Sequence, residues 1–172
     1  MESFFSIIFA FLVEAIILLQ YASRLFSPKR SLSGRLIVLS LLYICLCAIA
    51  FFNIKWLNML LYLLANFLFQ VTQYDVKWHV AAFHSVLLAA VMGMCELIVY
   101  GIIARTAPHF YMQMDSFHNT LLFILCSKIS FFAVIYLLTH LFKSLQKTAD
   151  SYDNSVLLLM IIPVTSIFIM LT

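Results

Sequence analysis

Two charged residues lie inside apolar segments of this sequence, where a charge needs a partner. Glu96 stands in AAVMGMCELIVYG, and Lys128 stands in LLFILCSKISFFAVIYLL. Burying either charge alone in hydrocarbon costs about 2.5–3.5 kcal/mol on insertion scales, so each needs an opposite charge or a water-lined cavity. Because their signs are opposite, we expect an ion pair that either marks a functional site or holds two helices in register.

The composition indicates a membrane protein built from helices. Of the 172 residues, 65% are hydrophobic and 10% are charged, and the mean hydropathy is +1.09. This leaves too little polar surface for a soluble domain of this length. The apolar residues form long runs and not ten-residue alternating segments, so we expect helices and not a transmembrane barrel. The predicted fold is an all-α, multi-pass bundle in the cell membrane, with residues 1–172 as a single transmembrane domain in contact with the lipid bilayer.

Six apolar runs come close to the roughly 20 residues that cross about 30 Å of hydrocarbon. They cover residues 3–22, 36–52, 56–73, 80–104, 120–142 and 155–172. The odd-numbered linkers carry seven of the ten Lys and Arg residues, and the even-numbered linkers carry two. By the positive-inside rule the odd-numbered linkers face the cytoplasm and the N-terminus lies outside. Any cytoplasmic domain then requires a seventh span beyond Thr172.

This topology places the intramembrane charges at nearly the same depth. Glu96 and Lys128 are each about eight residues, or about 12 Å, from the outer end of their predicted spans. Glu14 in the first span is about one turn deeper and could reach the same layer. Two carboxylates then share one ammonium, so the remaining carboxylate either carries a proton or is available to another cation.

The fourth linker is the one long segment on the predicted outer side. Its candidate ligand-facing residues are His109, Phe110, Tyr111, Asp115, Phe117 and His118. A contact surface for an external partner and an amphipathic connector lying among the lipid headgroups fit this linker equally well. In the last apolar run, Pro163 frees a backbone carbonyl that Thr165 or Ser166 could satisfy, which predicts a kinked helix.

Patterns of catalysis and metal binding are missing from the sequence. There is no H-E-x-x-H, G-x-S-x-G or P-loop motif, and the four cysteines lie in apolar runs without C-x-x-C spacing. Cys95 and His84 would be about 16 Å apart along one helix, which is too far for a Cys–His nucleophile pair. His84 and His140 lie at similar depth and could pair, but without further ligands. We therefore expect no metal, no cofactor and no nucleic-acid partner.

The order of short motifs along the chain resembles a known sensor family. These motifs are EAIILL in the first run, W-L-N-x-L-L in the third, C-E-L-I-V in the fourth, S-K-I-S-F-F in the fifth and L-L-L-M-I-I-P-V-T-S-I in the sixth. Together they resemble the membrane sensor region of the accessory-gene-regulator-type histidine kinases of Firmicutes, which sense peptides and carry a cytoplasmic GHKL ATPase domain. By this resemblance, Glu96 and Lys128 correspond to the acidic and basic intramembrane positions of the family. Pro163 and Ser166 correspond to its P-x-x-S motif.

The resemblance implies a homodimeric receptor for an extracellular, often cyclic and hydrophobic peptide, which acts in quorum sensing through a two-component system. Residues 1–172 hold no ATP-binding motif, so the resemblance implies a cytoplasmic kinase domain beyond Thr172. A small transporter or channel subunit using Glu14, Glu96 and Lys128 as an ion relay is an alternative. Another alternative is the membrane peptidase that matures such peptides, although its G-x-H-like turn is absent.

Overall fold

The computed structural model describes residues 2–50, 52, 54–107 and 117–146, and these residues form helices and no strand. The helices are α1 (Glu2–Leu25), α2 (Leu32–Ala50), α3 (Lys55–Gln73), α4 (Trp78–Thr106) and α6 (Phe117–Gln146). The predicted all-α class is confirmed, and the first five apolar runs each lie almost entirely within a helix. The sixth run, 155–172, lies outside the described residues, together with the predicted kink at Pro163 and Ser166.

Helices α1, α2, α4 and α6 are long and apolar enough to cross a membrane. Helix α3 does not meet this criterion of length and hydropathy, although its apolar run was predicted as the third span. Polar residues lower its hydropathy, and three of them, Asn66, Gln70 and Gln73, recur at the i, i+4, i+7 spacing that places them on one face. The ends of two helices agree with the positions of prolines, which disfavour a helical conformation in the preceding residue. Helix α1 ends shortly before Pro28, and α4 ends shortly before Pro108.

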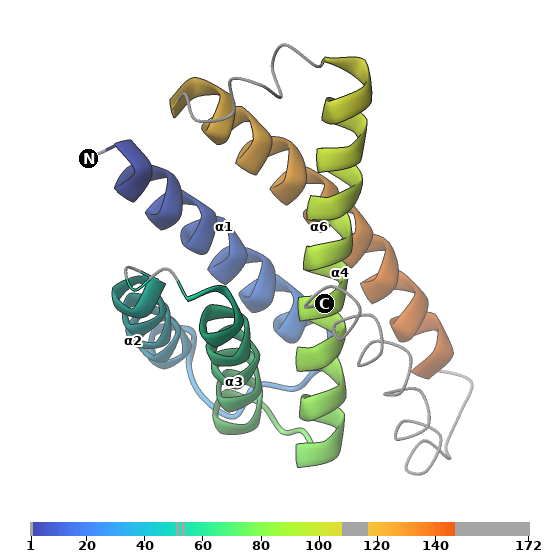
Figure 1. Ribbon diagram of the computed structural model, residues 1–172. Coiled ribbons are helices and arrows are strands. Elements are labelled where there is room, and N and C mark those ends of the chain that lie inside the picture. The colour runs from blue at the N-terminus through green and yellow to red at the C-terminus, as the bar shows by residue number, and fades with distance from the viewer. Residues whose placement is uncertain (1, 51, 53, 108–116, 147–172) are drawn as a thin grey trace.

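The five described helices close into a ring in which each packs mainly against two neighbours. Contacts join α1 to α2, α2 to α3, α3 to α4, α4 to α6 and α6 back to α1. In Figure 1, α1 and α6 run side by side in the same direction, and α4 crosses them in the opposite direction. Helix α6 therefore packs against both α1 and α4, so one side chain on α6 can reach both.

The outer surface of the bundle is largely apolar and its interior contains polar side chains, which is the reverse of the pattern in a soluble protein. Large apolar side chains such as Leu41, Ile44 and Leu137 are about 60% exposed, whereas Asn66 and Gln70 are fully buried. Such an apolar exterior is favourable against lipid and unfavourable in water. The burial pattern is thus compatible with a membrane protein whose polar groups face the interior of the bundle.

Two linkers at one end of the bundle are held together by backbone hydrogen bonds. Lys29 N–H donates to Gln73 O at 2.9 Å, and Asp75 N–H donates to Ser27 O at 2.9 Å. They flank an isolated antiparallel bridge between Pro28 and Tyr74. This contact ties the α1–α2 linker to the α3–α4 linker and fixes the two helical hairpins relative to each other.

Candidate functional site

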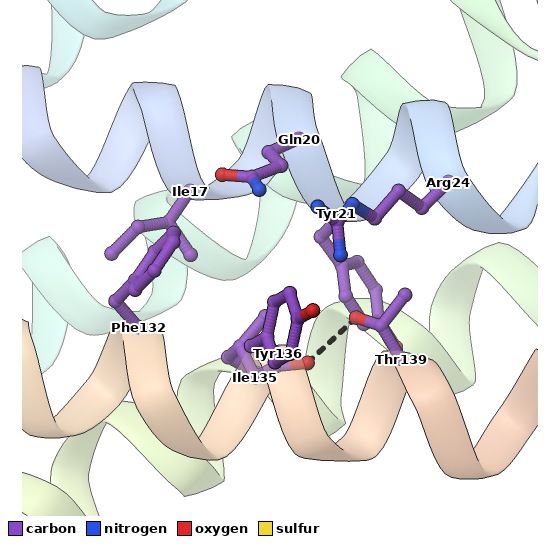
Figure 2. Close-up of a pocket in the computed structure, with 8 residues that line it drawn as sticks. All are labelled: Ile17, Gln20, Tyr21, Arg24, Phe132, Ile135, Tyr136 and Thr139. Atoms are coloured by element: carbon purple, nitrogen blue, oxygen red, sulfur yellow. Dashed lines mark hydrogen bonds between the residues drawn. The ribbon is translucent and has the colours of Figure 1, made fainter.

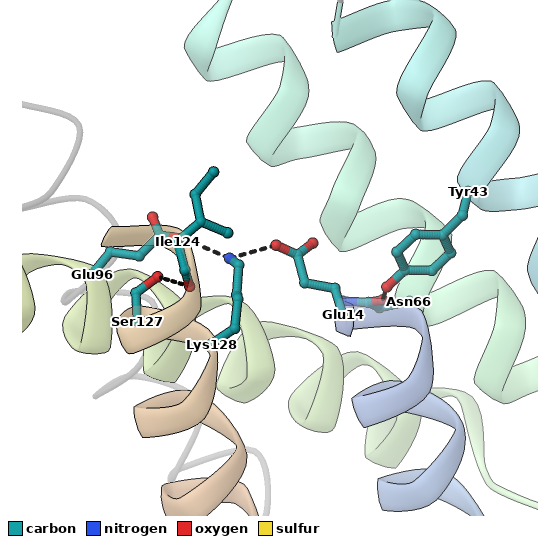
Figure 3. Close-up of polar contacts among 7 residues, drawn as sticks. All are labelled: Glu14, Tyr43, Asn66, Glu96, Ile124, Ser127 and Lys128. Carbon is teal, nitrogen blue, oxygen red and sulfur yellow. Dashed lines mark hydrogen bonds and ion pairs between the residues drawn. The ribbon is translucent and has the colours of Figure 1, made fainter. Parts of the chain in front are cut away.

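Lys128 on α6 holds two carboxylates from two other helices. Its Nζ donates to Glu96 Oε1 of α4 at 2.7 Å and forms an ion pair with Glu14 Oε1 of α1 at 2.6 Å. Figure 3 shows the Lys128 side chain lying between the two carboxylates. Because both contacts are charge-assisted, this cluster links α1, α4 and α6 through one ammonium group.

The two carboxylates differ in their surroundings. The Glu14 side chain is 6% exposed, whereas the Glu96 side chain is 40% exposed. Among the described residues, Glu14 Oε2 has no hydrogen-bond partner. A buried carboxylate oxygen without a partner is costly. The cluster therefore contains one more carboxylate than ammonium, and one buried oxygen of Glu14 remains to be satisfied.

An open cavity adjoins this charge cluster. It has a volume of about 690 Å³ and lies between α1, α3, α4 and α6, with Glu14 and Glu96 in its wall. The aromatic rings of Phe11, Tyr62, Tyr100 and Phe123 also line it, together with Asn58 and two methionines. Its size and its apolar wall with a few polar groups are typical of small-molecule sites. We call it the carboxylate cavity.

A second cavity of about 410 Å³ extends the first one towards α6. It shares Glu14, Asn58 and Glu96 with the carboxylate cavity and adds Ser127 and Lys128 to the wall. All three charged side chains of the cluster can thus be reached from the space between the helices.

The small cavity between α1 and α6 is a packing defect and not a ligand site. Figure 2 shows its lining, with Ile17 and Phe132 at one end and Arg24 and Thr139 at the other. Its volume is about 10 Å³, which is about the minimum for one water molecule. The Arg24 guanidinium lies 4.8 Å from the centre of the Tyr136 ring, so a cation–π contact joins α1 to α6 beside this cavity.

A second polar contact joins α1 to α4 nearer the tied linkers. Tyr21 Oη and His84 Nδ1 are 2.5 Å apart and both side chains are buried. Rings of Phe26, Phe83 and Phe142 surround the imidazole. A contact between His84 and His140, which the sequence left possible, is not among the contacts of His84. His140 is exposed on α6, because its neighbour Thr139 takes the buried face of that helix.

The polar face of α3 supplies groups that the sequence prediction did not assign to a site. Gln70 Nε2 donates to Ser85 Oγ at 3.2 Å, and Tyr43 Oη donates to Asn66 Oδ1 at 3.4 Å. Among the described residues, Asn66 Nδ2, Gln70 Oε1 and Gln73 Oε1 remain without partners. The i, i+4, i+7 spacing of these amides was the available signal, because it marks one helical face.

The candidate ligand-facing linker is only partly covered by the structure. His109, Phe110, Tyr111 and Asp115 lie outside the described residues. Phe117 and His118 lie in the first turn of α6, so these two belong to a helix and not to a loop.

The described residues offer little support for metal or thiol chemistry. They contain no group of three or more His, Cys, Asp or Glu side chains that could hold a metal ion. Cys45, Cys47, Cys95 and Cys126 are all free thiols. Cys95 is buried, and the Nδ1 of His84 on the same helix is occupied by Tyr21. The geometry therefore does not bring a cysteine and a histidine together for nucleophilic catalysis.

Comparison of the chain with protein-family models, with curated proteins and with solved structures finds no match. The fold and the site together define an apolar helical bundle of membrane type, with a buried charge cluster and an adjoining cavity between its helices.

Proposed function

We propose that this chain is the membrane-embedded sensor domain of a two-component histidine kinase and detects an extracellular, hydrophobic peptide. The observation that carries the proposal is the placement of Glu14 and Glu96, which are both ion-paired with Lys128 and also line the carboxylate cavity. A ligand in this cavity contacts the charges that join three helices. The resemblance to peptide-sensing kinases supplies the class of signal and output.

The proposal includes the full predicted topology. Residues 2–25, 32–50, 55–73, 78–106 and 117–146 provide five spans, residues 155–172 provide the sixth, and the N-terminus lies outside. Helix α3 crosses the membrane despite its amides, because those amides face the interior of the bundle and not lipid. The receptor is a homodimer in the cell membrane, and its kinase domain follows Thr172.

In this proposal the charge cluster is a two-state element. A ligand that binds one arrangement of α1, α4 and α6 more tightly than another shifts the population towards that arrangement. The half-exposed Glu96 is the partner whose contact with Lys128 changes at the lowest cost, since water can replace the lost hydrogen bond. Movement of α4 relative to α6 then passes the signal through the bundle.

The reading frame downstream of residue 172 provides the first test. We expect it to encode a seventh span followed by a GHKL ATP-binding domain. The full-length protein in proteoliposomes should then change its rate of autophosphorylation when synthetic hydrophobic cyclic peptides are added on the outer side. A stop codon directly after Thr172, or a full-length kinase indifferent to every peptide of the set, contradicts the proposal.

A small transporter or channel subunit is the second candidate. The supporting observation is the row of amides without complete partners, Asn66, Gln70 and Gln73, on the buried face of α3. Buried amides of this kind can hold water molecules and so line a path for an ion or a proton. Ion or proton flux in proteoliposomes, lost when Glu14 is replaced by Gln, would favour this function over the sensor.

A further inference from the structure

We propose that the carboxylate cavity binds the positively charged amino group of an organic ligand, with the apolar part of the ligand among the aromatic rings. The inference deepens the proposed sensor function and rests on it for the idea that the ligand is a signal. It begins from two observations on Glu14. Its side chain is buried, and its Oε2 has no hydrogen-bond partner among the described residues, although Glu14 lines the cavity.

The charge balance of the cluster favours a cation at this place. Lys128 neutralises one of the two carboxylates that contact it, so Glu14 and Glu96 together leave one negative charge. An uncompensated charge within a bundle is costly, and a second cation beside it removes that cost. A ligand ammonium group has N–H donors for Glu14 Oε2 and for the half-exposed Glu96.

The rest of the sequence offers few cations for this role. Residues 148–172, including the predicted sixth span, contain no Lys, Arg or His, and residues 108–116 contain His109 alone. Arg105 is exposed and lies nine residues beyond Glu96, about 13 Å along α4. Lys55 begins α3, close in sequence to Asn58 of the cavity wall, and it is therefore included in the test below.

The remaining wall of the cavity suits an apolar ammonium compound. Phe11, Tyr62, Tyr100 and Phe123 present rings from four different helices. Rings attract organic cations through their π faces and also bury apolar groups. The volume of about 690 Å³ is in the usual range for ligands of drug size. A metal ion is a poorer candidate, because beyond the two carboxylates the wall offers few oxygen ligands and is mostly apolar.

Paired probes that differ only in charge test the inference. The protein in lipid nanodiscs is titrated with leucyl-phenylalanine amide, which has a free amino group, and with its N-acetyl derivative, which has none. We expect the free amine to bind at least tenfold more tightly and to raise the melting temperature of the protein. Equal binding of the two probes, tighter binding of the acetylated one, or no binding of either overturns the inference.

Variants locate the amine. Glu14→Gln should weaken the free amine at least tenfold and leave the affinity of the acetylated probe unchanged. Glu2→Gln, the same substitution at the start of the same helix, is the matched control and should change neither affinity. Lys55→Gln should leave the amine affinity within twofold. An increase of tenfold or more in this variant would mean that Lys55 already occupies the site, which contradicts the inference.

A protonated Glu14 is the main competing explanation of its free oxygen, and infrared spectroscopy tests it. The difference spectrum between the wild-type protein and Glu14→Gln should show an ionised carboxylate, with no carbonyl band of a protonated acid. Such a band, unchanged by the free amine, overturns the inference.

The outcomes separate this inference from the proposed function. Binding in nanodiscs needs no kinase domain. If the two probes bind equally but the full-length kinase responds to peptide, the amine site alone is rejected. Charge-selective binding with no kinase downstream of Thr172 retains the amine site and rejects the histidine-kinase sensor.

Discussion

Lys128 and Glu14 place opposite charges 2.6 Å apart although both side chains are at most 6% exposed. Since a buried ion pair is costly to desolvate, its net stabilisation is small, but removing Lys128 leaves two carboxylates without a cation. The ion pair between α1 and α6 therefore requires both residues. The same Lys128 also forms the ion pair with Glu96 on α4.

Replacing Lys128 by Met should destabilise the bundle by about 3–5 kcal/mol, because two carboxylates then share a site without a cation. Unfolding in detergent with increasing denaturant measures the change. Lys143→Met, in the last turn of the same helix where the side chain is exposed, is the control and should stay within about 0.5 kcal/mol of wild type. Adding Glu14→Gln and Glu96→Gln to Lys128→Met should recover most of the loss. Wild-type stability of Lys128→Met would show that the ion pairs do not form.

The two carboxylates should respond differently to the same substitution. Glu96→Gln should cost about 1 kcal/mol or less, because its side chain is 40% exposed and partly solvated. Glu14→Gln should cost more, since it removes the buried partner of Lys128. In the full-length sensor, Glu96→Gln should change the response to peptide more than the amount of protein in the membrane. If response and abundance fall in equal proportion, the pair with Glu96 is only structural.

The predicted orientation can be tested with single cysteines. In a background without the four natural cysteines, Thr106→Cys at the end of α4 and Ser31→Cys in the α1–α2 linker provide two exposed positions at opposite ends of the bundle. We expect a membrane-impermeant maleimide to label position 106 in intact cells and position 31 only after permeabilisation. The reverse pattern would place the N-terminus inside. The cysteine-free protein controls for background labelling.

The sequence was sufficient for the five described helices and for the shared level of Glu96 and Lys128 along two of them. Apolar runs located five helices because hydrocarbon and helix geometry together fix their length. Counting residues placed Glu96 and Lys128 at one level, and their contact follows because α4 and α6 are consecutive neighbours. Glu14, counted as one turn deeper, contacts Lys128 as closely as Glu96 does. The long side chain of Lys128 and the tilt of the helices remove the difference, and of these two only the tilt is not given by the sequence.

Contacts between helices distant in sequence could not be predicted. Apolar runs indicate which segments are helical, but they do not show that α6 packs beside α1 and closes the ring. For the same reason a pair of His84 with His140 on the next helix was considered possible, whereas His84 contacts Tyr21 of α1. The cavity also arises from this closure, since its wall combines side chains of α1, α3, α4 and α6.

The Tyr21–His84 contact provides the last prediction. Replacing Tyr21 by Phe removes the hydroxyl and leaves His84 Nδ1 buried among aromatic rings without its hydrogen-bond partner. We expect a loss of about 1–2 kcal/mol, in the range of polar contacts between membrane helices. Tyr136→Phe on the exposed face of α6 is the matched control and should be nearly neutral. Adding His84→Phe to Tyr21→Phe should restore much of the stability, because neither of the two positions then leaves a buried polar atom without a partner. A double variant that is less stable than Tyr21→Phe alone would show that His84 has a further polar partner, and the contact with Tyr21 would then be only part of its role.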